Sequence, residues 1–224
     1  PLDGIILTIP ATELYGHSSE AHERVARAEE KAQLIYRKLW HAQKTLGMRL
    51  PIYILVTKCD NVPGYKSFTR HAPDRLKHGI MGWSSPYSID AAYSSDVAEE
   101  VMRQTIGDIA QLQMEMFAER GGSKDADPLF AFPDHFKTMH GPLKAYLDHL
   151  FKTSAYHESF FLRGIYFTGD EGRAPMTSEE KKPVFLHDLF EQKIFPEHGL
   201  ARPATGNLLD RSRTAQVLQV ATIT

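Results

Sequence analysis

Apolar and polar positions alternate along the chain in patterns that predict strands and helices in turn. Residues 4–9, Gly-Ile-Ile-Leu-Thr-Ile, form an almost continuous apolar and β-branched run, which Pro10 closes. A run of this kind is typical of a strand that is covered on both faces. Between residues 19 and 46, apolar side chains recur at spacings of three and four, and Gly47 follows where helices commonly end. We therefore predict a long helix whose charged opposite face is solvated.

A second apolar run, residues 52–56, follows Pro51 and ends in residues 57–60, Thr-Lys-Cys-Asp. A strand, a long helix and a second strand form a βαβ unit, in which the strands are parallel and the crossover is right-handed. Ligands of parallel sheets bind beyond the carboxyl ends of the strands. Residues 57–60 lie at such an end and form the first candidate site.

The rest of the chain is predicted to be mostly helical around one further strand. We expect helices at about residues 94–119, 142–151 and 183–195, and a third strand at residues 160–168. Residues 121–128, rich in Gly and Asp, are expected to form an exposed loop. The aromatic residues expected in the core are Phe130, Phe132, Phe136 and Tyr146.

Composition excludes several classes of protein. The 224 residues carry a net charge of −2, which argues against nucleic-acid binding. A single cysteine, Cys59, excludes an intramolecular disulfide and a multi-thiolate zinc site, and a role as a small packed residue is favoured for it. The eleven histidines lack metal-ligand spacing. No signal peptide is visible, and no run approaches the roughly 20 apolar residues that span a bilayer.

A Thr-Lys-x-Asp turn after a buried strand has a defined role in GTPase-like folds, where the Asp accepts two charge-assisted hydrogen bonds from guanine. Here Asp60 would take that place, the stem of Lys58 would cover the base, and Thr57 would orient the turn. Thr168 and Gly169, at the end of the third strand, fall where a backbone amide contacts the guanine carbonyl. The alternative interpretation is a structural turn at a strand end, and the sequence leaves both open.

The phosphate-binding elements of such a fold are missing from the sequence. It contains neither Gly-x-x-x-x-Gly-Lys-Ser/Thr nor an Asp-x-x-Gly strand end. Base contacts give specificity, whereas phosphate and Mg²⁺ contacts give catalysis. We therefore expect no nucleotide hydrolysis, no catalytic residue and no cofactor in this chain. Its ends, at Pro1 and in the apolar residues 217–224, are expected to be cuts through a longer protein.

The predicted fold class is α/β: a partial P-loop GTPase-like parallel sheet flanked by helices, with a largely helical insertion. Residues 1–60 form the βαβ part, residues 61–159 the mainly helical insertion, and residues 160–198 the last strand and closing helix. Residues 199–224 form a tail.

Several segments in one order resemble the cytoplasmic domain of the IcmF/TssM family, the large inner-membrane component of bacterial type VI secretion systems. The matching segments are residues 1–8, 51–60, 63–65 with Phe68, 130–133, 150–151, 163–168, 188–190 and 194–197. One departure follows Thr168, where the family's Ser-Gly-Thr-Gln-Glu-Gly is replaced by the shorter Gly169-Asp170-Glu171-Gly172-Arg173. This loop places two acidic residues beside the predicted base site.

The resemblance implies an assembly component on the cytoplasmic side of the bacterial inner membrane, held there by membrane segments outside this chain. The tail would lead toward a downstream membrane segment. Implied partners are TssL, the lipoprotein TssJ and baseplate components, and GTP or ATP with Mg²⁺ would bind only in the full-length protein. Two other interpretations stay open. One is a catalytic NTPase whose phosphate-binding half lies upstream of Pro1, and the other is an α/β binding module unrelated to secretion.

Overall fold

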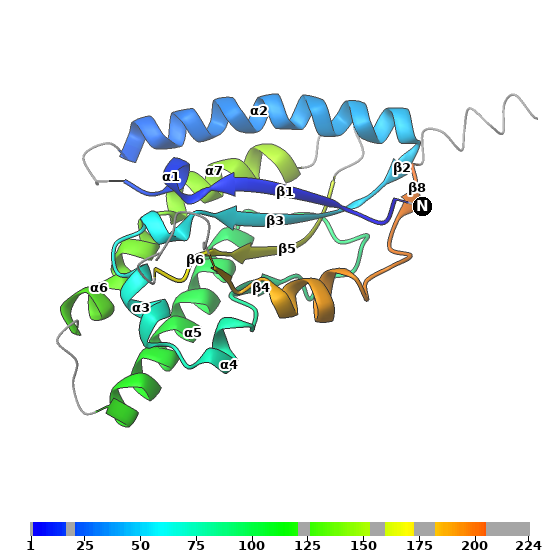
Figure 1. Cartoon of the computed structure of the whole chain (residues 1–224). Helices are drawn as coiled ribbons and strands as arrows, with labels where there is room; N and C mark the ends of the chain where they lie inside the picture. The colour runs from blue at the N-terminus through cyan, green and yellow to red at the C-terminus, as the bar shows by residue number, and fades with distance from the viewer. Residues whose placement is uncertain (1, 17–20, 121–125, 153–159, 173–181, 205–224) are drawn as a thin grey trace, which may run out of the picture.

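A four-stranded sheet forms the centre of the computed structural model, which describes residues 2–16, 21–120, 126–152, 160–172 and 182–204. Its strands, in spatial order, are β1 (Ile5–Pro10), β3 (Pro51–Thr57), β5 (Phe161–Phe167) and β4 (Gly82–Ser84). The first three are parallel, and β4 runs antiparallel to β5 (Figure 1). The three predicted strands and the mixed α/β class are confirmed. The GTPase-like assignment remains a prediction.

The central strands follow from the apolar runs in the sequence. Six of the seven residues of β3 are buried, as are six of the seven in β5. Such continuous burial is characteristic of parallel strands with both faces covered. Because Pro51 cannot donate a ladder hydrogen bond, it is suited to the first position of its strand.

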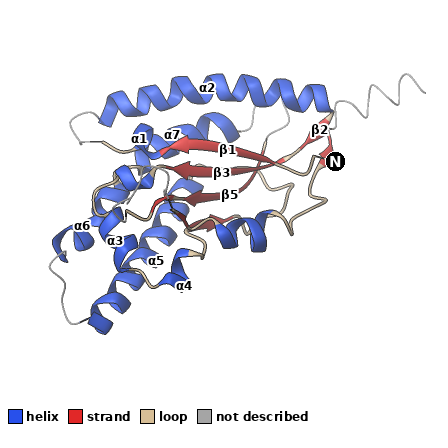
Figure 2. Cartoon of the chain, in the orientation of Figure 1, coloured by secondary structure: helices blue, strands red, loops and turns tan. Residues whose placement is uncertain are grey.

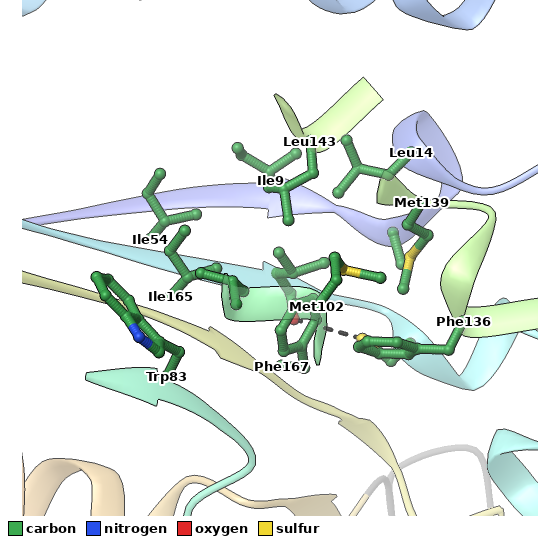
Figure 3. Close-up of a cluster of buried hydrophobic side chains, with 14 of the residues drawn as sticks. Ile9, Leu14, Ile54, Trp83, Met102, Phe136, Met139, Leu143, Ile165 and Phe167 are labelled. Atoms are coloured by element: carbon green, nitrogen blue, oxygen red, sulfur yellow. Dashed lines mark hydrogen bonds between the residues drawn. The ribbon is translucent and has the colours of Figure 1, made fainter. Parts of the chain in front are cut away.

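Four long helices flank the sheet (Figure 2). They are α2 (Ala21–Leu46), α5 (Val97–Arg120), α6 (Ala126–Lys137) and α7 (His140–Phe151). Their buried side chains join those of one sheet face in a single apolar core (Figure 3). In that core Ile54, Ile165 and Phe167 of the sheet lie near Met102 and Phe136 of the helices (Figure 3). The predicted helices at 19–46, 94–119 and 142–151 are confirmed where they are described.

Short elements connect these parts. They are α1 (Ala11–Leu14), β2 (Met48–Arg49) paired with β8 (Arg202–Pro203), η2 (Cys59–Asn61), α3 (Tyr65–His71), α4 (Asp74–Lys77), and β6 (Gly169–Asp170) paired with β7 (Pro183–Val184). Residues 121–125 of the predicted loop lie outside the described residues, and residues 126–128 begin helix α6 instead of continuing the loop. Most of the predicted tail also lies outside the described residues. Among the described residues, none of the helices has the length and apolar character needed to span a membrane.

The predicted helix over residues 183–195 is wrong in its first four residues and begins only at residue 187. Residues 183–184 form strand β7, and Phe185 follows with a φ of 64°. A bulky residue in the left-handed region interrupts any helix. The amide of Phe185 donates a hydrogen bond to the carbonyl of Lys77 at 2.7 Å, so a contact with α4 sets this conformation. Residues 187–194 are helical, and within them Leu189–Ile194 form a short π-type helix, η3.

Two further differences concern the insertion. Strand β4 was not predicted, because three residues are too short for a recognisable pattern. Gly82 in it has a φ of 144°, and a Cβ there would lie 2.2 Å from the Ile165 carbonyl oxygen, so only glycine fits. Phe130 was predicted in the core, but 58% of it is exposed and its ring stacks on Phe117 at the surface of α5 and α6. The other three predicted aromatics are buried.

Candidate functional site

The carboxyl ends of β3 and β5 meet and are joined by hydrogen bonds. The amide of Cys59 donates to the Thr168 carbonyl at 3.0 Å, and the amide of Thr168 donates to the Val56 carbonyl at 2.8 Å. The amide of Asp170 donates to Oδ1 of Asp60 at 3.2 Å. The structure therefore brings the two predicted halves of the site together, although they lie about 110 residues apart in the sequence. We call this arrangement of residues 57–60 and 168–170 the strand-end site.

The turn after β3 has an unusual backbone. Lys58 adopts the left-handed conformation, with φ 59° and ψ 32°, and leads into the 3₁₀ turn η2. This conformation is costly for a residue with a β-carbon and needs support from its surroundings. Asn61 supplies it by donating both its backbone amide, at 3.1 Å, and its side-chain Nδ2, at 3.0 Å, to the Lys58 carbonyl. The Lys58 side chain is exposed.

Gly169 packs closely against the end of the other strand. A Cβ at this position would lie 2.6 Å from the backbone nitrogen of Asp60 and 2.9 Å from Cε1 of Tyr65. Tyr65 is itself buried, and its ring packs edge-on against Phe132 and Phe185. Neither neighbour can withdraw easily, so the site requires glycine here.

The remaining predicted residues differ in how far they are available to a ligand. Thr168 is 4% exposed, and its hydroxyl donates to the Val184 carbonyl at 2.7 Å. Its amide and carbonyl are also used within the chain. Thr57 and Asp60 are half-buried. Oδ1 of Asp60 accepts a hydrogen bond from the Asp170 amide.

Cys59 is fully buried, and its Sγ donates a hydrogen bond to the Val56 carbonyl at 3.6 Å. Burial raises the pKa of the thiol far above its ordinary value, so the reactive thiolate is not formed near neutral pH. The predicted role of Cys59 as a small packed residue is confirmed.

A buried ion pair beside the site escaped the sequence analysis. The Glu171 side chain is 1% exposed, and its Oε1 lies 2.6 Å from Nζ of Lys77. The hydroxyl of Thr69 donates to the Glu171 carbonyl at 2.9 Å, and Nζ of Lys77 also contacts Asp74 at 3.0 Å. The sequence predicted that Asp170 and Glu171 both lie beside the base site. The carboxylate of Glu171 instead points toward Lys77 and forms this ion pair. Only long-range contact information could have shown that.

A second polar cluster lies on the other face of the sheet, toward the amino ends of β3 and β5. Arg163 donates two hydrogen bonds of 2.7 Å to the carboxylate of Glu197, and Tyr53 donates a third at 2.8 Å. Lys193 also pairs with this carboxylate. Burial alone would raise the pKa of Glu197, but the hydrogen bonds from Arg163, Lys193 and Tyr53 outweigh it and lower the pKa to about 2. Through these contacts Glu197 links Lys193 of η3 to Tyr53 and Arg163 of the sheet.

In the described parts of the chain, no three His, Cys, Asp or Glu side chains lie close enough together to hold a metal ion.

The model of the IcmF-related N-terminal domain matches residues 1–222. The chain belongs to the IcmF-related family. It is also 29% identical, over 230 aligned positions, to the type VI secretion system component TssM1 of Pseudomonas aeruginosa. That alignment covers 89% of this chain and 20% of TssM1, so the chain spans about a fifth of the length of this relative. No solved structure is significantly similar to the chain.

Membership of the IcmF-related family confirms the resemblance drawn from the ordered motifs. The family match spans the strand-end site, the buried ion pair and the Glu197 cluster alike. Nucleotide binding by Thr57, Lys58, Asp60, Thr168 and Gly169 stays a prediction.

Proposed function

We propose that this IcmF-related domain is a structural and assembly module of a type VI secretion membrane complex. The observation that carries this proposal is the family match over residues 1–222, together with the similarity to a protein named as a type VI secretion component. The domain would lie on the cytoplasmic side of the bacterial inner membrane, with its membrane segments outside residues 1–224. Its partners would be TssL, TssJ and baseplate components.

The geometry of the strand-end site supports a structural role for most of its residues. Its backbone groups form hydrogen bonds with one another, and the hydroxyl of Thr168 donates a hydrogen bond to the Val184 carbonyl. A GTPase-like P-loop fold would explain why two loops so distant in sequence converge at one sheet edge. We propose that the sheet is the base-reading part of such a fold.

Nucleotide modulation in the full-length protein is the finer part of the proposal. GTP or ATP with Mg²⁺ would bind through phosphate contacts supplied by polypeptide outside this chain. Within the chain, Oδ2 of Asp60 would accept hydrogen bonds from the base, and the stem of Lys58 would cover it. Oδ1 is held by Asp170 at 3.2 Å, which fixes the orientation of the carboxylate before any ligand arrives.

Asp60→Asn separates the structural from the ligand-binding role of this carboxylate. The amide oxygen of asparagine can still accept the Asp170 amide, whereas its NH₂ group would face the donors of guanine. We therefore expect folding to persist while GTP and GDP affinity falls at least tenfold, measured by calorimetry on the full-length gene product. Asp134→Ala, at an exposed position on α6, is the control.

Secretion assays in the parent bacterium separate assembly from nucleotide binding. Deleting the gene should abolish type VI secretion and the co-purification of the other complex subunits. Complementation with Asp60→Asn should restore co-purification fully and secretion only in part. Full secretion with Asp60→Asn, or no nucleotide binding by the wild-type protein in calorimetry, would contradict nucleotide modulation. The assembly role alone would then remain. Normal secretion in the deletion strain would contradict the assembly role itself.

A further inference from the structure

A small hollow lies at the amino end of β5, whereas the strand-end site lies at its carboxyl end. The hollow has a volume of about 150 Å³ and is lined from β4, the start of β5, the start of α5 and the segment 85–94. The seven residues of β5 separate it from the strand-end site by roughly 20 Å, so the two are distinct. Its larger apolar and aromatic walls are Trp83, Tyr87, Tyr93, Phe160 and Leu162. We call this hollow the aromatic pocket.

Hydrogen bonds hold the walls of the aromatic pocket in place. The hydroxyl of Tyr87 donates to Glu100 at 3.0 Å, and the hydroxyl of Tyr93 donates to Asp148 at 3.0 Å. Trp83 is only 2% exposed and is fixed in strand β4. Because these walls are already ordered, a ligand would not have to order them on binding, and its affinity would be higher for that reason.

The size of the pocket limits what it can bind. A cavity of about 150 Å³ with apolar walls holds one benzene-sized ring. Pockets for cofactors and drug-sized ligands are larger, at about 300–1,000 Å³. At interfaces between proteins, single aromatic side chains commonly fill small pockets of this kind and carry much of the binding energy. The size therefore favours one large side chain of another polypeptide.

The surroundings of the pocket are acidic. Residues 80–102 contain four acidic residues and no Lys, Arg or His. Two cations reach this region from elsewhere, but Lys144 pairs with Glu99 at 3.3 Å and Arg163 pairs with Glu197 at 2.7 Å. The acids that have no cationic partner in the described part of the chain are Asp90, Asp96 and Glu100.

We infer that the aromatic pocket binds one phenylalanine-sized side chain of a partner protein, in a segment where lysine or arginine residues flank that side chain. The ring would be buried between the aromatic walls, and the flanking cations would lie against Asp90, Asp96 and Glu100. Acids at the start of α5 also suit the helix dipole, so their charge alone would not identify a ligand. Their position around an aromatic hollow does, because complementary charge gives an interface its specificity. The inference goes beyond the proposed function and does not depend on nucleotide binding at Asp60.

A fluorescent peptide, Gly-Lys-Lys-Phe-Lys-Lys-Gly, tests this by anisotropy with the full-length gene product. We expect saturable binding that weakens as salt is added, because the flanking charges are exposed. Replacing its phenylalanine with alanine should weaken binding about tenfold or more, since the anchor is lost. Replacing its lysines with glutamates should weaken binding about tenfold or more as well, since like charges would then meet.

Variants of the protein locate the bound peptide. Ala92 is exposed and lines the pocket, so Ala92→Trp should fill the hollow and weaken binding about tenfold or more. Ala118→Trp is the matched control, because Ala118 is also exposed and lies about 30 Å along α5 from Val97. It should leave binding unchanged. Asp96→Asn combined with Glu100→Gln keeps acceptor oxygens in place and should weaken binding and reduce its dependence on salt.

Four results would overturn the inference. They are no binding by the wild-type protein, equal binding of the phenylalanine and alanine peptides, equal binding of the lysine and glutamate peptides, and binding that survives Ala92→Trp. A dimeric mass that Ala92→Trp abolishes, without any peptide binding, would assign the pocket to a second copy instead. The peptide series uses the unaltered protein, so it decides even where a variant fails to fold.

Discussion

Replacing Glu197 with glutamine should lower the stability of the fold near pH 7 and have little effect near pH 2. The Glu197 carboxylate accepts hydrogen bonds from Arg163 and Tyr53 and pairs with Lys193. These partners hold its pKa at about 2 in the folded chain, against an ordinary value of 4.5. The folded state therefore binds the proton less readily than the unfolded state. The stabilising contribution of the Glu197 carboxylate is complete above about pH 5.5 and is lost as the pH falls through 4.5 toward 2.

The magnitude follows from the same two values. A pKa difference of about 2.5, at about 1.36 kcal/mol for each pKa unit, corresponds to about 3 kcal/mol near pH 7. The Glu197 side chain is 16% exposed, so water screens part of this interaction, and we expect about 1–3 kcal/mol. Glutamine retains the size of the side chain, but it loses the charge and replaces one acceptor oxygen with an NH₂ donor.

Urea unfolding at several pH values is the assay. The difference in unfolding free energy between wild type and Glu197→Gln should shrink from about 1–3 kcal/mol near pH 7 to below about 0.5 kcal/mol near pH 2. Glu115→Gln, at an exposed position on α5, controls for the general effect of removing one negative charge. A difference for Glu197→Gln that is the same at all pH values would refute the reasoning.

Two sets of substitutions and one chemical modification test the strand-end site and its surroundings. Gly169→Ala should cost about 1–3 kcal/mol in urea unfolding, because its Cβ would lie 2.6 Å from a backbone nitrogen. Gly107→Ala is the control, because Gly107 lies in the middle of a helix and no neighbouring atom lies within 4 Å of the added Cβ. It should raise the unfolding free energy by about 0.5–1 kcal/mol. Equal changes in the unfolding free energy of the two variants would contradict this account. Lys77→Met should cost about 3–5 kcal/mol by leaving the Glu171 carboxylate buried without its lysine, and adding Glu171→Gln should recover much of it. Additive losses in that double variant would contradict the pairing. Iodoacetamide, followed by mass spectrometry, should modify Cys59 only after unfolding, and rapid modification of the native chain would show that the thiol is accessible.

The sequence predicted what local patterns determine. The apolar runs of β1, β3 and β5 and the periodicity of α2 identified those elements, because a strand or helix must bury a matching set of side chains. Strand polarity then placed residues 57–60 and 168–169 at one sheet edge, and the structure joins them there.

Contacts between distant parts of the chain account for the errors. The left-handed conformation of Phe185 accompanies a hydrogen bond to Lys77, more than a hundred residues earlier in the chain. The partner of Glu171 lies 94 residues away, so the acid was placed beside the site rather than in a buried ion pair. Phe130 was assigned to the core by its chemistry alone, although helix α6 turns it outward.

The ties between the two strand ends are made almost entirely by main-chain atoms: an amide of Cys59, an amide and a carbonyl of Thr168, a carbonyl of Val56 and an amide of Asp170. Main-chain groups are the same in every residue except proline, so substitutions among relatives leave them in place. Replacement of Asp60 would therefore remove only the bond to the Asp170 amide, while the main-chain bonds that join Cys59, Thr168 and Val56 would remain. The shape of this sheet edge is thus set mainly by the backbone, independently of any ligand.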